Sequence, residues 1–162
     1  MLFRSAFCGD LKYGRTVHSL IRTLARFGTK KFALVSPEEL KLPDALKRQL
    51  IEKYQVELVE VPYMEDVIDD VDIFYMTRIQ KERFFNEADY LKLKNSFKLT
   101  REKLKNAKPD MIIMHPLPRV NEIAYDVDED QRAVYFEQSE MGVYVRMALI
   151  TKLLEVGPYA RS

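Results

Sequence analysis

The sequence lacks several features that would assign a protein class at once. It has a single cysteine, Cys8, in 162 residues, which excludes an intramolecular disulfide and favours a reducing compartment. No stretch approaches the roughly 20 apolar residues of a membrane-spanning helix, and the first residues lack the pattern of a signal peptide. The formal net charge is +1 without a basic block, which argues against nucleic-acid binding. We therefore expect a cytoplasmic protein that binds neither nucleic acid nor membrane.

Motifs for common cofactors and metals are also missing. Gly9 and Gly14 do not form the Gly-x-Gly-x-x-Gly pattern of dinucleotide-binding proteins, and no Gly-x-Ser-x-Gly is present. The acidic run at 126–130 departs from the calcium-loop pattern, so we interpret it as a solvated turn. Cys8 has no Cys or His at metal-ligand spacing and lies in a predicted strand, which indicates packing. We expect no metal and no cofactor.

Short apolar runs alternate with stretches of helical periodicity. The predicted strands are residues 6–8, 32–35, 56–61, 73–76 and 111–114. The predicted helices are residues 17–28, 37–54, 67–71, 87–94, 100–106 and a long terminal helix at about 138–156. This alternation predicts an α/β fold with a doubly wound, mainly parallel sheet of about five strands flanked by helices. With 47% hydrophobic residues, residues 1–162 can build one domain with its own core.

The terminal helix is unusually apolar. One side of it carries Met141, Tyr144, Val145, Ala148, Leu149, Leu153 and Val156. The first strand also begins almost at residue 1. Together these features predict that the chain is half of a larger protein.

Three arginine-bearing segments follow predicted strands, at residues 9–18, 76–83 and 114–119. Ligands of open α/β sheets bind outside the carboxyl ends of the strands, so the three segments predict a pocket for a small anion with more than one acidic group. Arginine suits this task because its planar guanidinium bonds a carboxylate or phosphate through two parallel contacts.

The individual candidates each have a plainer interpretation. Arg15 begins a predicted helix, where anions are favoured, but a lone arginine is usually a solvated surface residue. Arg78 and Gln80 point the same way in an extended segment, although that segment could simply be a charged loop. In His115-Pro116-Leu117-Pro118 the prolines remove two backbone donors and leave carbonyls free for a ligand NH2. His115 fits either a core residue or a group that polarises a carbonyl.

These segments resemble the aspartate-binding half of the aspartate carbamoyltransferases, over about residues 7–154 and in the order of that family. Ornithine carbamoyltransferases resemble His-Cys-Leu-Pro at the third segment, and Pro116 here favours aspartate. The resemblance implies that Arg15, Arg78 and Gln80 hold the L-aspartate carboxylates. It also implies that backbone groups of Pro116, Leu117 and Pro118 face the carbamoyl NH2. Lys12 and Tyr13 would join a loop-closure network with an acidic partner near Glu87 or Asp89.

The same resemblance shows what the chain does not contain. The phosphate loop of the family, which resembles Ser-x-Arg-Thr-Arg, is absent, as is the lysine loop contributed by a neighbouring subunit. The resemblance implies transfer of the carbamoyl group from carbamoyl phosphate to L-aspartate, in pyrimidine biosynthesis, without a cofactor. It also implies a missing amino-terminal carbamoyl-phosphate domain and a homotrimer of catalytic chains, with or without regulatory chains. The isolated chain is expected to be inactive. A non-catalytic amino-acid-binding module and a transcarbamylase of the ornithine type remain alternatives.

Overall fold

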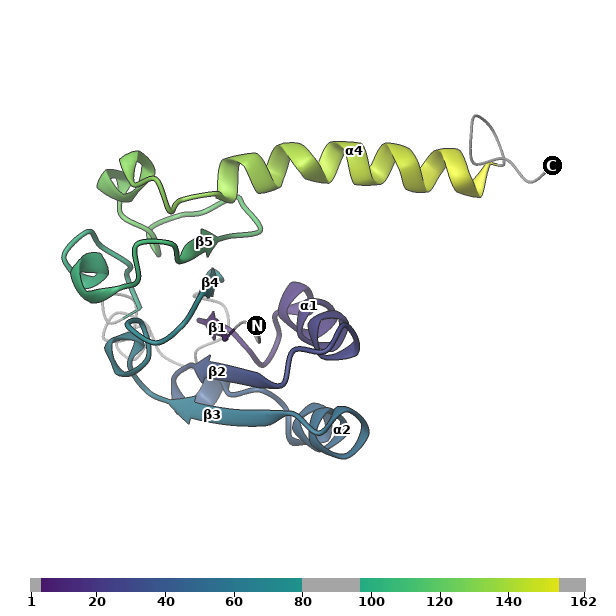
Figure 1. The fold of residues 1–162 in the computed structure, drawn as a ribbon, viewed down its shortest axis with the longest axis horizontal. Helices are drawn as coiled ribbons and strands as arrows, with labels where there is room; N and C mark the ends of the chain where they lie inside the picture. Colours follow the sequence, from purple (N-terminus) through teal and green to yellow (C-terminus); the bar gives the residue numbers. More distant parts are fainter. Residues whose placement is uncertain (1–3, 80–96, 155–162) are drawn as a thin grey trace.

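The computed structural model describes residues 4–79 and 97–154, and its centre is a single parallel sheet (Figure 1). The strands are β1 (Ser5–Cys8), β2 (Lys31–Val35), β3 (Glu57–Val61), β4 (Ile73–Met76) and β5 (Ile112–Met114). Their order in space is β3-β2-β1-β4-β5, and all four pairings are parallel. The predicted five-stranded parallel sheet is therefore confirmed.

The strand order creates a switch point beside β1. The chain moves outward from β1 to β2 and β3, and then returns to the other side of β1 with β4. Cys8 is in register with Val35 of β2 and Met76 of β4, so the three strands end at the same level. Connections that leave β1 and β4 diverge at this edge, and a crevice forms between them.

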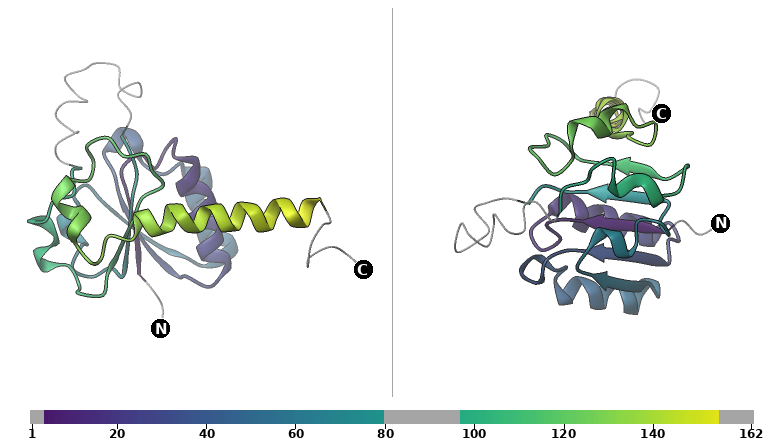
Figure 2. Two further views of the ribbon diagram at one scale, coloured as in Figure 1. Left: turned by 90° about the horizontal axis from the view of Figure 1, so that it is seen from above. Right: turned by 90° about the vertical axis from the view of Figure 1, so that its left-hand side faces the viewer.

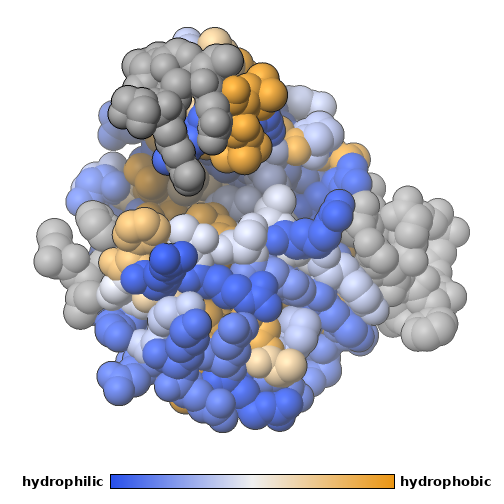
Figure 3. Space-filling view, turned by 90° about the vertical axis from the view of Figure 1, so that its right-hand side faces the viewer, coloured by the Kyte–Doolittle hydropathy of each residue, from blue (hydrophilic) through white to orange (hydrophobic). Residues whose placement is uncertain are grey.

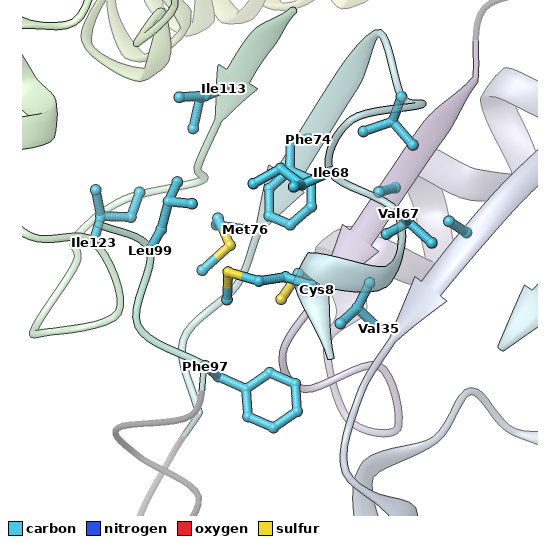
Figure 4. Close-up of a cluster of buried hydrophobic side chains, with 14 of the residues drawn as sticks. Cys8, Val35, Val67, Ile68, Phe74, Met76, Phe97, Leu99, Ile113 and Ile123 are labelled. Carbon is cyan, nitrogen blue, oxygen red and sulfur yellow. The ribbon is translucent and has the colours of Figure 1, made fainter. Parts of the chain in front are cut away.

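A hydrophobic core lies on each face of the sheet. On one face α1 (Arg15–Arg26) and α2 (Asp44–Tyr54) cover the sheet with Val17, Ile21, Leu46 and Leu50. On the other face Cys8, Val35, Phe74 and Met76 pack against loop residues that include Val67, Phe97 and Leu99 (Figure 4). Cys8 is fully buried there, and this burial raises the pKa of its thiol. The interpretation of Cys8 as a packing residue is confirmed.

Several predicted helix boundaries are wrong. The helix predicted at 37–54 is a 3-10 turn, η1 (Glu38–Leu40), followed by α2 from Asp44. Pro43 sits at the N-cap of α2, and a proline disfavours helical backbone in the residue before it, so the helix cannot run through. Residues 67–71 form turns after η2 (Met64–Asp66). The segment at 100–106 is the 3-10 helix η4 (Lys103–Asn106), and the predicted helix 87–94 lies outside the described residues.

The terminal helix α4 (Tyr135–Leu153) leaves the body of the protein as a rod (Figures 1 and 2). Of its 19 residues only Tyr135, at the start, is buried. Exposed apolar side chains lie beyond the predicted side as well, since Val143, Met147 and Ile150 are at least half exposed. Seen from the free end of α4, hydrophobic surface lies beside the grey terminal residues, whereas the surface over α1 and α2 is mostly hydrophilic (Figure 3).

A helix that is apolar on most of its surface is normally buried in a larger assembly. None of the helices within residues 4–79 and 97–154 combines the length and hydropathy needed to cross a membrane. In the chain, the 3-10 helix η5 (Tyr125–Glu129) lies between β5 and α4.

Candidate functional site

The connections that follow β1, β4 and β5 meet in one open cleft of about 440 Å³ at the carboxyl edge of the sheet. The residues that line it are Asp10, Tyr13, Gly14, Arg15, Thr16, Thr77, Arg78, His115, Pro116, Leu117 and Pro118. The prediction that the three segments converge on one pocket is confirmed for the described residues. Gln80 and Asp89 lie outside them.

Two glycines allow the first connection to lie against its neighbours. Gly9 has φ +116°, and a Cβ on it would be 2.5 Å from the carbonyl oxygen of Thr77. A Cβ on Gly14 would be 2.4 Å from the carbonyl oxygen of Asp10. Thr77 fastens the same junction, because its hydroxyl donates to the Cys8 carbonyl at 3.1 Å and accepts from the Asp10 N–H at 2.9 Å. The floor of the cleft is therefore held by contacts between β1 and β4.

The first turn of α1 gives the cleft an anion-attracting wall. Gly14 occupies the N-cap without a side-chain cap, and the first turn contains no acidic residue. The first N–H groups of a helix have no intrahelical acceptor and carry the positive end of the helix dipole. Arg15 begins this helix, is exposed, and lines the cleft. An anion placed here would meet both backbone donors and a guanidinium.

Arg78 supplies the second cation of the cleft. It follows β4, and its position next to Thr77 ties it to the junction between the two central strands. It is half-buried, whereas Arg15 is exposed. Within the described part of the chain, no carboxylate forms an ion pair with either arginine. Both guanidinium groups are thus available to a ligand as far as these residues are concerned.

The segment 115–118 forms a wall of a different chemical character. Pro116 and Pro118 have no N–H, and the Leu117 N–H donates to Nδ1 of His115 at 2.9 Å. The His115 N–H donates to Oε1 of Gln138 in α4 at 3.0 Å. Leu117 has φ +49°, and the Leu117–Pro118 peptide bond is cis. Backbone donors in this wall are used internally, so it offers a ligand carbonyl oxygens, which accept hydrogen bonds.

His115 is a buried residue and not an exposed acid–base group. Its side chain is 1% exposed, and Nε2 lies 2.8 Å from Oε1 of Glu122. Burial by itself raises the pKa of the Glu122 carboxyl. Hydrogen bonds from His115 and from the N–H groups of residues 120–122 outweigh burial and lower this pKa to about 2. Of the two interpretations of His115, the structure supports the core residue.

Arg119 was expected to contribute to the pocket as the arginine of the third segment, but it does not line the cleft. Its guanidinium makes a bidentate contact with the carboxylate of Asp128 and donates to the Tyr135 hydroxyl at 3.1 Å. The contact with Arg119 lowers the pKa of the Asp128 carboxyl. The interpretation of the acidic run as a solvated turn is also wrong in part, since Asp130 pairs with Arg132 at 2.8 Å. The contacts of Arg119 with Asp128 and Tyr135 join the loop after β5 to η5 and to the start of α4.

Lys12 lines a second, smaller hollow instead of the cleft. The other residues of this hollow belong to η1 and the start of α2 and include Glu38, Glu39 and Asp44. The Lys12 ammonium lies 5.3 Å from the centroid of the Tyr13 ring, and Tyr13 itself lines the cleft. Lys12 and Tyr13 are therefore neighbours at the rim, while their predicted role in loop closure stays a prediction.

A larger hollow of about 830 Å³ lies elsewhere, between η4 and the end of η5. Its charged residues pair with one another: Arg132 with Asp130 at 2.8 Å, Lys105 with Glu102 at 2.6 Å, and Arg101 with Glu129 at 3.9 Å. These pairs leave that hollow poorly suited to a charged ligand, whereas the smaller cleft presents Arg15 and Arg78. In the described ranges no group of three or more His, Cys, Asp or Glu side chains is arranged to hold a metal ion.

Asp10, Thr16 and Thr77 lie in the predicted segments but were not singled out as candidates, and Glu122 lies outside those segments. Thr77 directly precedes Arg78, so its place after a buried strand was a usable signal. Glu122 is seven residues from His115, and nothing in that spacing indicates their contact.

The family model for the aspartate/ornithine carbamoyltransferase Asp/Orn binding domain matches residues 3–153. The chain belongs to this family. Among curated relatives, the aspartate carbamoyltransferase catalytic subunit of Clostridium botulinum (strain Eklund 17B / Type B) is 60% identical over 149 residues, covering 92% of this chain and 48% of the relative. That of Clostridium acetobutylicum is 58% identical with the same coverage. The chain thus spans about half the length of the curated relatives it matches.

Solved structures of Asp/Orn binding domain proteins agree in fold. The catalytic subunit of M. jannaschii aspartate transcarbamoylase superposes with a TM-score of 0.88 at 47% identity, covering 95% of this chain and 49% of that one. Aspartate transcarbamoylase from Trypanosoma cruzi, in complex with N-(phosphonacetyl)-L-aspartic acid, superposes with a TM-score of 0.83 at 38% identity, covering 92% and 48%. The fold of the described residues is therefore that of the matched half of these aspartate transcarbamoylase chains.

Proposed function

We propose that this chain is the aspartate-binding half of an aspartate carbamoyltransferase. The observation that carries the proposal is the division of the cleft into two kinds of wall. Arg15 and the start of α1, together with Arg78, form a cationic side, and the segment 115–118 forms a side of carbonyl oxygens. A dicarboxylate that carries a nucleophilic amine, next to a group that presents an NH2, fits these two walls together.

In the proposed reaction, the α-amine of L-aspartate attacks the carbonyl carbon of carbamoyl phosphate. A C–N bond forms, the C–O bond to phosphate breaks, and phosphate leaves with the electron pair while the amine loses a proton. The products are N-carbamoyl-L-aspartate and phosphate, as in pyrimidine biosynthesis. Arg15, Arg78 and Gln80 hold the two carboxylates, and carbonyl oxygens of Pro116, Leu117 and Pro118 accept from the carbamoyl NH2. The contribution of this chain is positioning, which removes much of the entropic cost of bringing two substrates together.

The phosphate of carbamoyl phosphate requires a second half of the protein. A phosphate dianion needs several charge-assisted donors, and Arg15 and Arg78 are engaged with aspartate in this proposal. We infer that an amino-terminal carbamoyl-phosphate domain supplies them and that α4 packs against it, which gives the exposed side chains of α4 their cover. A homotrimer of such chains, with or without regulatory chains, and a cytoplasmic location complete the proposal. The reaction uses no cofactor.

A transcarbamylase of the ornithine type is the second candidate. Its substrate carries a cationic side chain, which the two arginines would repel. A non-catalytic amino-acid-binding module remains the third, because the cationic wall alone would serve it. The ornithine type differs from the proposal in which amino acid competes for the cleft, and the binding module differs in showing no turnover.

The test compares Arg78→Ala with Arg101→Ala in a chimera. Residues 7–154 would replace the matching half of the Clostridium acetobutylicum subunit. Arg78→Ala should weaken L-aspartate and succinate binding by about tenfold to hundredfold, because a hydrogen bond to a charged group contributes about 1.5–3 kcal/mol. Arg101 is 54% exposed and lines the other hollow, so its removal should change binding less than twofold. Equal losses in calorimetric titrations, or competition by L-ornithine, would reject the proposed site.

A further inference from the structure

One buried pair of ionisable side chains has no direct place in the cleft chemistry. Glu122 is 6% exposed at its side chain and does not line the cleft, and His115 is 1% exposed. Burying a carboxylate is costly unless it is well hydrogen-bonded. Glu122 meets this condition, because Oε1 contacts His115 while Oε2 accepts from the N–H groups of Val120 at 3.1 Å and Asn121 at 3.0 Å.

The contacts of the His115 ring define its tautomer. Nδ1 lies 2.9 Å from the Leu117 nitrogen, which is a donor, so Nδ1 accepts and carries no proton. Nε2 must then carry the proton and donate it to Glu122 at 2.8 Å. The ring therefore links a carboxylate on one side to a backbone N–H of the cleft wall on the other.

The backbone at Leu117 needs such support. Its φ of +49° lies in the left-handed region, which residues with a side chain rarely adopt. Conformations of this kind persist where the surrounding structure fixes them, and they are frequent at ligand sites. The bond from Leu117 N–H to the residue two positions earlier has the geometry of a turn closed by a side chain.

We propose that Glu122 is a positioning residue that acts through the His115 ring to hold the Leu117 N–H, and thereby orients the carbonyl oxygens of residues 116–118 towards the cleft. The identity of the group that these carbonyls receive rests on the proposed function. The linkage itself, from carboxylate to imidazole to backbone, does not depend on it.

Replacement by glutamine separates this role from simple packing. The Glu122 carboxylate uses one oxygen for His115 and the other for two N–H groups. A glutamine has a single carbonyl oxygen, and its NH2 can only donate. If the NH2 faces Nε2, the ring must move its proton to Nδ1, and Nδ1 can no longer accept from Leu117. Glu122→Gln should therefore be nearly isosteric and yet disturb a backbone amide five residues away.

The decisive measurement is NMR of the full 162-residue chain, labelled with ¹⁵N, because the sequence contains two histidines. His18 is the internal reference, since its Nε2 lies 2.8 Å from the Leu11 carbonyl oxygen and is remote from Glu122 in sequence. In the parent chain, His115 should show a protonated Nε2 and an unprotonated Nδ1. In Glu122→Gln this pattern should change and exchange of the Leu117 amide should accelerate about tenfold or more. Unchanged His115 ring shifts and Leu117 exchange would overturn the proposal.

A second pair of variants keeps the test informative if Glu122→Gln folds poorly. In His115→Asn, the side-chain oxygen can still accept from the N–H two residues later, although it cannot reach Glu122. Protection of the Leu117 amide should survive in His115→Asn and be lost in His115→Leu. Undiminished protection in His115→Leu would contradict the proposal, because leucine has no acceptor for the Leu117 N–H. The matched control is Glu129→Gln, because Glu129 is 79% exposed at the end of η5 and its replacement should leave every one of these signals unchanged.

Kinetics in the chimera add the link to function. Glu122→Gln should lower kcat for carbamoyl transfer at least tenfold and change KM for aspartate less than threefold, because the arginines that bind aspartate are untouched. A loss confined to the aspartate KM would contradict the assigned role. If the parent chimera shows no transfer, the proposed function fails, while the ring nitrogens and the Leu117 amide still decide whether the linkage exists.

Discussion

The exposed helix α4 leads to a prediction in which the same change has different consequences in the isolated chain and in a complete enzyme. Val145 is 68% exposed and Leu149 is 56% exposed, so each still has about half of its burial energy to gain. Fully burying such a side chain contributes about 1.5–3 kcal/mol, and covering the exposed parts of this pair would therefore stabilise by about 2 kcal/mol. We predict that the isolated chain gains this energy by self-association through α4.

The perturbation is the double substitution Val145→Lys and Leu149→Lys. Sedimentation velocity should show that the parent chain forms a dimer or larger species and that the double substitution lowers its association constant at least roughly thirtyfold. This factor corresponds to the loss of about 2 kcal/mol, since every 1.4 kcal/mol is a factor of ten. The free energy of unfolding in urea should change by less than about 0.5 kcal/mol, as expected for solvent-exposed positions. In the chimera, where the second half would cover α4, the same pair should lower stability by about 2 kcal/mol or more.

The matched control is Ile51→Lys. Ile51 is 50% exposed on α2 and lies away from α4, so its replacement should leave both association and stability nearly unchanged. A strictly monomeric parent chain in which the double substitution costs more than 2 kcal/mol would refute the reasoning, because α4 would then have its full cover within this chain.

Three further predictions concern the site and its supports. Gly9→Ala should lower the free energy of unfolding by about 2 kcal/mol or more and weaken aspartate binding. Gly28→Ala should lower it by about 1 kcal/mol and leave binding intact, because Gly28 has φ +101° but no atom lies within 4 Å of the new Cβ. Urea unfolding and calorimetry measure the two effects. The pKa of the Glu122 carboxyl is lowered to about 2 from 4.5, which corresponds to a contribution of about 3 kcal/mol to the free energy of unfolding. This contribution is present above pH 4.5 and is lost as the pH falls towards 2. Glu122→Gln should remove this part of the acid-unfolding transition. Arg119→Lys should lower stability by about 1–3 kcal/mol without changing aspartate affinity, because its bidentate partner Asp128 lies outside the cleft.

The sheet and the location of the cleft could be predicted from the sequence. Buried parallel strands appear as short apolar runs, and the strand that contains Phe74 and Met76 is buried as its pattern indicates. Arg15 and Arg78 could be placed at one edge because ligands of such sheets bind at the carboxyl ends of the strands. These inferences depend on periodicity and connectivity, which a sequence carries directly.

The side-chain pairing could not be predicted in the same way. Arg119 resembles Arg15 in the sequence, yet its guanidinium is taken by Asp128 and Tyr135, which the η5 turn and the start of α4 bring beside it. The Glu122–His115 contact likewise depends on how the loop after β5 folds back. The start of α2 was misplaced because the predicted helix 37–54 ran through Pro43, whereas the helix begins at Asp44, directly after this proline.

The most direct test of the proposed function is a carbamoyl-transfer assay on three samples. They are the isolated chain, the chimera with the amino-terminal half of the Clostridium acetobutylicum subunit, and the chimera with Arg78→Ala. We predict no measurable N-carbamoyl-L-aspartate from the isolated chain, turnover by the chimera, and a loss of at least tenfold in kcat/KM for aspartate with Arg78→Ala. Turnover by the isolated chain, or a folded chimera without turnover, would contradict the assignment of this chain as the aspartate-binding half of the enzyme.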